Sequence, residues 1–305
     1  MKQNKKYGGV VIPAITPFTA ELNLDHSAVV RMFDYFHEHG VHPFVLGTTG
    51  EAASIPMGMK KEFLQLAGKR KNKGELLYAG IAANARQESI DLAKYSFDQG
   101  ADVVVATLPS YYSLTESSML KYFEELADEI PGPLMIYNIP ATTYMSIPLR
   151  IIDILSHHNN IVGTKDSERS EERLKESIQM WKDRSDFSHL LGWAAKSADA
   201  ILLGSDGLVP STGNFQAKLY ADLFEAARQN DIEKAFALQE LSDRLGSLYQ
   251  QGRTLGESLW ALKVLMKEFG ICERFVLPPL YEQTDAEIKK LQEGLQQILK
   301  AEVKM

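Results

Sequence analysis

One lysine in this sequence has a position that suits it for covalent chemistry. Lys165 closes the apolar stretch Ile161–Thr164, which predicts a buried β-strand. An amine at the end of such a strand is partly desolvated, so its pKa falls below the usual value of about 10.4. A neutral amine can attack a carbonyl carbon and form a Schiff base. Most lysines are solvated surface charges. The hypothesis that Lys165 is a nucleophile therefore needs support from other residues.

Hydroxyl groups follow other predicted strands. Gly47–Glu51 is a glycine-hinged turn in which Thr48, Thr49 and backbone N–H groups suit a small anion such as a carboxylate. Tyr137 ends a further apolar run, and its phenol could move a proton if it faced the same site. Tyr112 follows a third run. Taken alone, these residues also fit a plain turn, a hydrogen-bonded core tyrosine and packing at a rim.

Metal-ligating residue types are present without the spacing of a known metal motif. His37 and His39 lie in the last turn of a predicted helix, where the helix dipole favours cations, and His42 follows shortly after. Cys272 is the single cysteine, which excludes an internal disulfide and a thiol cluster for zinc. The sequence contains no His-Glu-x-x-His, P-loop or nucleophile-elbow motif. We therefore predict no metal site.

Short β-rich runs alternate with amphipathic helices along most of the chain, and this rhythm must position the candidate residues. Eight such units predict a closed α/β structure, the (β/α)₈ TIM barrel, in which function collects at the carboxyl ends of the strands. The predicted strands are 9–14, 41–46, 76–81, 103–107, 134–138, 161–165, 188–192 and 207–209. The predicted helices are 25–39, 57–71, 86–99, 115–130, 148–157, 171–181, 197–203 and 214–228.

The pattern changes after Asn230 to helices alone. We predict three of them, at 232–249, 258–269 and 285–300. The expected organisation is a barrel over residues 1–230 and a helical extension over residues 231–305 that packs on it.

Length and charge limit the functional classes. A chain of 305 residues can form one large core as a single barrel. A net charge of −7 argues against general affinity for nucleic acid or anionic membranes. The N-terminus does not have the pattern of a signal peptide, and no apolar run approaches the roughly 18 residues that cross a bilayer. We expect a cytoplasmic protein.

Three motifs together resemble a known family. Gly-Thr-Thr-Gly-Glu at 47–51, Tyr-Asn-Ile-Pro at 137–140 and Gly-Thr-Lys-Asp at 163–166 have the order and separations of the N-acetylneuraminate lyase and dihydrodipicolinate synthase superfamily. The resemblance extends from about Gly8 to Leu299. It implies a (β/α)₈ barrel without metal or organic cofactor. It also implies a pyruvate-dependent class I aldolase or lyase, which acts on a 2-oxo acid and an aldehyde.

The resemblance also implies roles for individual residues. Lys165 is similar to the lysine that forms the Schiff base, and Tyr137 to the catalytic tyrosine. Thr48 and Thr49 resemble the hydroxyl pair that holds the carboxylate of the keto acid and relays protons. Val209 matches a position whose backbone lines the keto-acid pocket.

A homotetramer is the assembly that the resemblance implies. Tyr112 resembles the tyrosine that, in the synthases, reaches into the site of a neighbouring subunit. The same tyrosine is therefore expected at a contact between subunits.

The positions that select the second substrate depart from the best-known members. Thr142 stands where the synthases carry an arginine that binds the carboxylate of the aldehyde. Ala194 and Ala195 stand where sialic acid lyases carry an Asp-Glu pair, and Tyr144 replaces a common glycine. We therefore favour an aldolase or lyase for another acceptor, such as a 2-keto-3-deoxy sugar acid or a less polar aldehyde. The alternatives are a dihydrodipicolinate synthase that holds the aldehyde with another cation, and a non-catalytic keto-acid-binding barrel.

Overall fold

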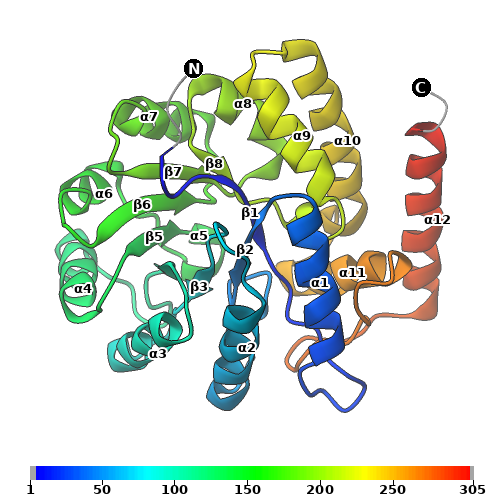
Figure 1. The fold of residues 1–305 in the computed structure, drawn as a ribbon, viewed down its shortest axis with the longest axis horizontal. Helices are drawn as coiled ribbons and strands as arrows, with labels where there is room; N and C mark the ends of the chain where they lie inside the picture. Colours follow the sequence, from blue (N-terminus) through cyan, green and yellow to red (C-terminus); the bar gives the residue numbers. More distant parts are fainter. Residues whose placement is uncertain (1–4, 303–305) are drawn as a thin grey trace.

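Eight parallel strands close into a barrel in the computed structural model, which describes residues 5–302 (Figure 1). Each strand pairs with the next along the chain, and β8 pairs back with β1. The structure confirms the predicted (β/α)₈ barrel, including its two short last strands. The strands are β1 Gly9–Pro13, β2 His42–Val45, β3 Tyr78–Gly80, β4 Val103–Ala106, β5 Leu134–Asn138, β6 Ile161–Asp166, β7 Ser188–Leu191 and β8 Gly207–Leu208.

Helices cover the outside of the strands (Figure 1). All of the predicted barrel helices are present, and the first begins as expected where the Asp25 side chain accepts a hydrogen bond from the Ala28 N–H. They are α1 His26–Glu38, α2 Met57–Arg70, α3 Arg86–Asp98, α4 Glu116–Glu129, α6 Leu149–Leu155, α7 Glu171–Trp181, α8 Ser197–Leu203 and α9 Ala217–Arg228.

Three short helical turns were not predicted: α5 Pro140–Thr143, η1 Ala194–Lys196 and η2 Ser211–Asn214. Each follows the carboxyl end of a strand, β5, β7 or β8, where a barrel carries its functional groups. The last of them takes up the start of the helix predicted at 214–228, so that α9 begins three residues later, at Ala217.

The apolar strand runs are explained by burial on both faces. Val105 and Tyr137 point into the barrel interior, where they belong to one apolar cluster. Val104 and Ile136 point outward into the larger cluster between strands and helices. Side chains alternate between the two faces of a strand, so both alternating sets must be apolar here. Tyr137 faces inward for this reason.

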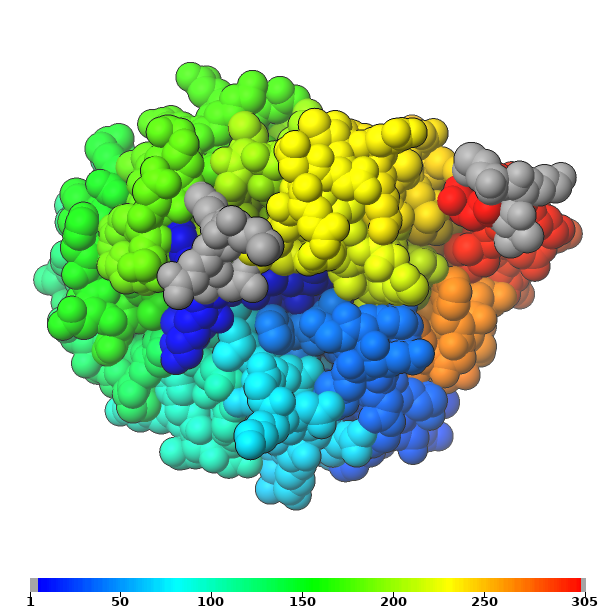
Figure 2. All heavy atoms as spheres, turned by 45° about the horizontal axis from the view of Figure 1, so that its top comes forward, coloured from blue at the N-terminus to red at the C-terminus, as the bar shows by residue number. Residues whose placement is uncertain are grey.

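The C-terminal extension consists of α10 Ile232–Gln250, α11 Leu255–Glu268 and α12 Asp285–Glu302. α11 starts earlier than predicted because Thr254 and Glu257 form a reciprocal capping box at its N-terminus. α10 packs on α9, and α12 packs on α10 and α11. Figures 1 and 2 show α12 at the edge of the molecule, away from the strands.

None of the helices within residues 5–302 combines the length and the apolar character that a membrane span requires.

Candidate active site

Lys165 and Tyr137 lie next to each other inside the barrel. They are paired across β6 and β5, and both side chains are buried. The Lys165 Nζ lies 3.8 Å from the centroid of the Tyr137 ring and 4.9 Å from the centroid of the Phe44 ring on β2. The predicted nucleophile is thus held between two aromatic faces.

These surroundings change the protonation of both groups. Burial lowers the pKa of the Lys165 amine, and the nearby Tyr137 offsets part of that effect. For Tyr137, burial alone would raise the pKa of the phenol. A protonated Lys165 and hydrogen bonds from Thr48 and Ser167 outweigh burial and lower that pKa. A proton on one of the two groups therefore affects the other, as a nucleophile and its proton carrier require.

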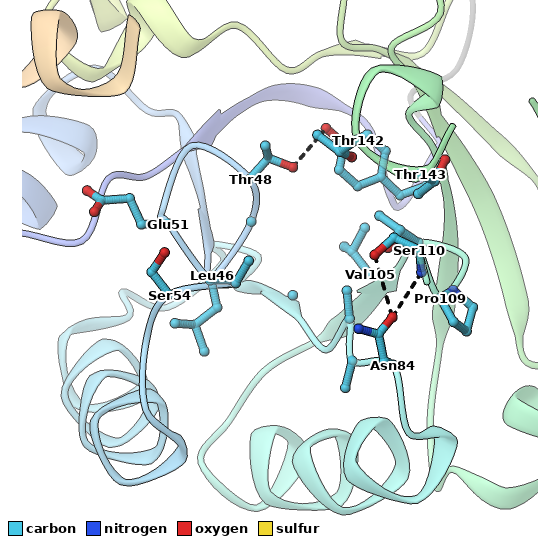
Figure 3. Close-up of a pocket in the computed structure, with 18 of the residues that line it drawn as sticks. Leu46, Thr48, Glu51, Ser54, Asn84, Val105, Pro109, Ser110, Thr142 and Thr143 are labelled. Carbon is cyan, nitrogen blue, oxygen red and sulfur yellow. Dashed lines mark hydrogen bonds between the residues drawn. The ribbon is translucent and has the colours of Figure 1, made fainter. Parts of the chain in front are cut away.

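Thr48 extends this pair into the turn after β2. Its Oγ1 lies 3.5 Å from the Tyr137 hydroxyl, the contact that a dashed line marks in Figure 3. This distance is long for a bond between hydroxyl groups, and such contacts often shorten when substrate binds. The turn itself needs Gly50, because a Cβ there would lie 2.9 Å from the backbone oxygen of Ala14.

A cavity of about 510 Å³ opens beside these residues. Thr48, Tyr137 and Phe44 line it, whereas Lys165, whose amine contacts the rings of Tyr137 and Phe44, is not among the lining residues. Thr142, Asn84 and Ser110 also line this cavity, and Figure 3 labels them together with Thr48. The cavity thus connects Thr48 and Tyr137 to Thr142, a position expected to meet the second substrate.

The remaining predicted residues lie outside the described cavity lining. Thr49 is half-buried in the same turn as Thr48. Val209 is buried in the apolar cluster that includes Tyr137 and Phe44, and its N–H donates to the Leu191 oxygen at 2.7 Å. Tyr112 is 75% exposed and stacks edge-on against Tyr111. The structure therefore brings Lys165, Tyr137 and Thr48 together, but leaves Tyr112 on the surface.

Of the positions that depart from the best-known family members, one lines the cavity and three do not. Thr142 lies on α5 and lines the cavity. Ala194 and Ala195 lie on η1 outside that lining, and the Ala194 oxygen accepts a hydrogen bond from Gln239 of α10. Tyr144 ends α5 in a left-handed conformation and is 86% exposed.

A polar network lies directly behind Lys165 and Tyr137, on the outer face of the strands. Asn138 follows Tyr137, Asp166 follows Lys165, and the Asn138 side chain donates to Asp166 at 3.2 Å. The Nε of Arg173, on α7, donates a second hydrogen bond to the Asp166 carboxylate, at 2.7 Å. Burial raises the pKa of Asp166, and Arg173 opposes that shift. The carboxyl ends of β5 and β6 are thereby joined to each other and to α7.

Sequence reasoning missed Asn84 and Ser110. Asn84 follows β3, and its side-chain oxygen accepts a hydrogen bond from the Ser110 N–H at 3.0 Å. Both residues line the cavity. The rule that directs attention to the carboxyl ends of barrel strands applies to β3 as well, and would have identified Asn84.

The closed barrel of parallel strands, each followed by a helix, defines the general class of the fold, a (β/α)₈ barrel. The model of the dihydrodipicolinate synthetase family matches residues 6–298, and the chain belongs to this family.

Individual relatives are similar over nearly their whole length. YagE of Escherichia coli K12, named as a candidate 2-dehydro-3-deoxy-D-gluconate aldolase, is 28% identical over 97% of this chain and 99% of its own. A crystal structure of YagE in complex with pyruvate has a TM-score of 0.90 at 27% identity, over 96% of this chain and 98% of that one. Dihydrodipicolinate synthase from Bacteroides thetaiotaomicron also has a TM-score of 0.90, at 29% identity over 97% and 100% of the two chains.

Proposed function

We propose that this lyase forms a Schiff base between Lys165 and pyruvate, and that it cleaves or forms a 2-keto-3-deoxy sugar acid. The observation that carries the proposal is the buried Lys165 amine, 3.8 Å from the centroid of the Tyr137 ring. Burial favours the neutral amine, which attacks the keto carbon of pyruvate.

The proposed chemistry assigns a step to each group. Attack by Lys165 gives a carbinolamine, which loses water to form a protonated imine. The imine accepts the electron pair of the adjacent carbon when that carbon loses a proton, and the resulting enamine adds to the aldehyde carbon, whose oxygen takes up a proton. Water then hydrolyses the product imine and frees the Lys165 amine. Cleavage runs the same steps in reverse. Tyr137 carries the protons, and the turn with Thr48 and Thr49 holds the carboxylate. Backbone groups near Val209 complete the keto-acid pocket.

The character of the cavity supports a hydroxylated acceptor. Thr142, Asn84 and Ser110 offer hydroxyl and amide groups along its wall. Such groups can hydrogen-bond to sugar hydroxyls, whereas Thr142 cannot give a carboxylate the bidentate contact of an arginine. The similarity to YagE, whose name indicates a 2-dehydro-3-deoxy-D-gluconate substrate, agrees with this choice.

One observation favours the synthase alternative. Lys60 of α2 also lines the cavity and could hold the carboxylate of an aldehyde in place of the missing arginine. Burial lowers the pKa of Lys60, and Glu88 opposes this shift. The two functions therefore differ in whether Lys60 matters for turnover.

Pyruvate release from 2-keto-3-deoxy-D-gluconate tests the proposed function. We expect release by the unaltered protein and none by Lys165→Ala. A protein that binds pyruvate but releases none from any 2-keto-3-deoxy sugar acid would contradict the substrate assignment. If the protein also failed to turn over any aldehyde with pyruvate, a non-catalytic keto-acid-binding role would replace the proposed lyase function. The homotetramer and the cytoplasmic location remain predictions.

A further inference from the structure

The turn that carries Thr48 ends in a charged residue, Glu51, whose side chain is buried. Glu51 forms an ion pair with Lys263 of α11, and both side chains are 0% exposed. The Lys263 Nζ also donates to the Phe275 oxygen at 2.7 Å, and the Leu277 N–H donates to the second Glu51 oxygen at 3.0 Å. One carboxylate thus connects the β2 turn to α11 and to the chain that follows it.

Such a pair is a poor means of stabilising a fold. Removing two charges from water costs more than their attraction usually returns, and well-packed apolar residues often serve as well or better. Glu51 also has a φ of 58°, a left-handed conformation that non-glycine residues rarely adopt. A buried charge and an unfavourable backbone conformation at one residue indicate that the location of this turn matters.

The turn is also held by the segment that follows β1. Thr16, which follows β1, is 0% exposed, and its hydroxyl donates to the Gly50 oxygen at 2.7 Å. In Figure 3 the side chains of Thr48 and Glu51 extend to opposite sides of the turn, Thr48 toward the dashed contact and Glu51 away from it. The fixed Glu51 side chain therefore sets where the Thr48 hydroxyl can lie.

We propose that Glu51 and Lys263 are positioning residues for the carboxylate-binding turn, and that the C-terminal extension is therefore part of the active site. The pair keeps the Thr48 Oγ1 at its distance of 3.5 Å from the Tyr137 hydroxyl. α11 contributes Leu255 and Leu259 to the cavity wall as well. This inference rests on the proposed function, because it concerns how the site binds a 2-oxo acid.

The chain offers a matched control for this pair. Lys5 forms an ion pair with Asp206 at 2.8 Å, and these side chains are 7% and 10% exposed. The Lys5 Nζ also donates to two backbone oxygens, those of Trp181 and Phe187. This second pair lies before β8, at the amino-terminal end of the barrel and opposite the cavity. Lys263→Met and Lys5→Met therefore break similar buried pairs at opposite ends of the barrel.

Both variants are incubated with increasing pyruvate and borohydride, and the labelled fraction is measured by mass spectrometry of the intact protein. A purely structural loss lowers the maximum labelled fraction, because unfolded molecules do not react. Loss of positioning instead raises the pyruvate concentration at half-maximal labelling. We expect a rise of about ten- to hundredfold for Lys263→Met, the factor for losing one hydrogen bond to a charged group. For Lys5→Met we expect no change in that concentration.

Thr16→Val provides a milder test if Lys263→Met does not fold. It removes the hydrogen bond to the Gly50 oxygen without leaving a buried charge unpaired, and half-maximal labelling should again need more pyruvate. If the folded variants reach half-maximal labelling at the same pyruvate concentration as the unaltered protein, the positioning role is overturned. It is also overturned if Lys5→Met raises that concentration as much as Lys263→Met does. In both cases the unaltered protein is still labelled, so the proposed function stands. No labelling of the unaltered protein with any 2-oxo acid would instead reject the proposed function.

Discussion

Tyr137 covers the amine of Lys165 with its ring and meets Thr48 with its hydroxyl, so one side chain has two separable contributions. Tyr137→Phe keeps the ring and removes only the hydroxyl. If Tyr137 moves protons, turnover should fall by about 10²- to 10⁴-fold, while pyruvate binding weakens far less. Steady-state kinetics on the sugar-acid substrate measure this effect. A fall of less than about fivefold, below the range for proton transfer, would exclude Tyr137 as the proton carrier.

The same variant should change the pH dependence of Lys165. Tyr137 raises the pKa of this amine against the larger effect of burial, which lowers it. Removing the phenol hydroxyl leaves burial in place and removes the opposing effect, so the pKa should fall further. The rate of borohydride trapping rises with pH as the neutral amine forms, and its midpoint should lie at lower pH in Tyr137→Phe than in the unaltered protein. A midpoint shifted upward would show that the two groups are not coupled in this way.

Thr142 and Lys60 decide between the two candidate second substrates. Without an arginine, a carboxylate-bearing aldehyde loses two charge-assisted hydrogen bonds of roughly 1.5–3 kcal/mol each, so aspartate semialdehyde should be turned over poorly.

Thr142→Arg should improve that activity, because the neighbouring Tyr144 side chain is 86% exposed and leaves the cavity open. A kcat/KM of about 10⁴ M⁻¹s⁻¹ or more in the unaltered protein would restore the synthase function. Loss of that activity in Lys60→Met would then identify the cation.

At the scale of the elements, the hydrogen-bonded network of Asn138, Asp166 and Arg173 joins the carboxyl ends of β5 and β6 to α7. Arg173→Met would leave the Asp166 carboxylate buried without its cation, which typically costs about 3 kcal/mol or more of the free energy of unfolding. Burial already raises the pKa of Asp166, and loss of Arg173 raises it further. In Arg173→Met the protonated, neutral Asp166 carboxyl group is less costly to bury than the carboxylate. The free energy of unfolding of this variant should therefore recover as the pH falls toward the raised pKa of Asp166, and be lost as the pH rises through it.

Thermal unfolding at several pH values measures this effect. Lys218→Met is a suitable control, because its pair with Asp222 is exposed and such pairs contribute little. Equal losses in the two variants at neutral pH would show that the Asp166 network does not stabilise the strand ends.

The elements differ in how far the sequence predicts them. Apolar runs identify all eight strands, because a barrel strand is buried on both faces and its composition reflects this. The turns α5, η1 and η2 carry no periodic pattern, since segments of three or four residues are too short to show one. The division of the chain near residue 230 remains a prediction drawn from the change in rhythm.

The site shows the same limit. Lys165, Tyr137 and Thr48 each stand at the end of a strand or in the turn beyond it, but that position alone also fits a plain turn and a core tyrosine, and the three motifs of the family resemblance were needed to select them. The Glu51–Lys263 pair joins residues 212 positions apart, and no local pattern indicates such a contact. The exposure of Tyr112 likewise depends on how the loops pack.

At the scale of the whole molecule, exposed aromatic residues gather beside the barrel mouth. Tyr111, Tyr112 and Tyr144 are 75–86% exposed, and the Leu114 N–H lies 3.1 Å from the Met145 sulfur, which joins their two loops. Contact with a second copy of the chain would cover these rings. We therefore expect the tetramer in sedimentation experiments, and a smaller species for Tyr112→Ala. A monomer alone at micromolar concentration would contradict this assembly and the sharing of Tyr112.

Covalent trapping tests the central claim most directly. The protein is incubated with pyruvate and borohydride, digested, and mapped by mass spectrometry. The account predicts one stable adduct on Lys165, none on Lys60 or Lys263, and no adduct in Lys165→Ala. An adduct on another lysine, or no adduct with any 2-oxo acid, would contradict it.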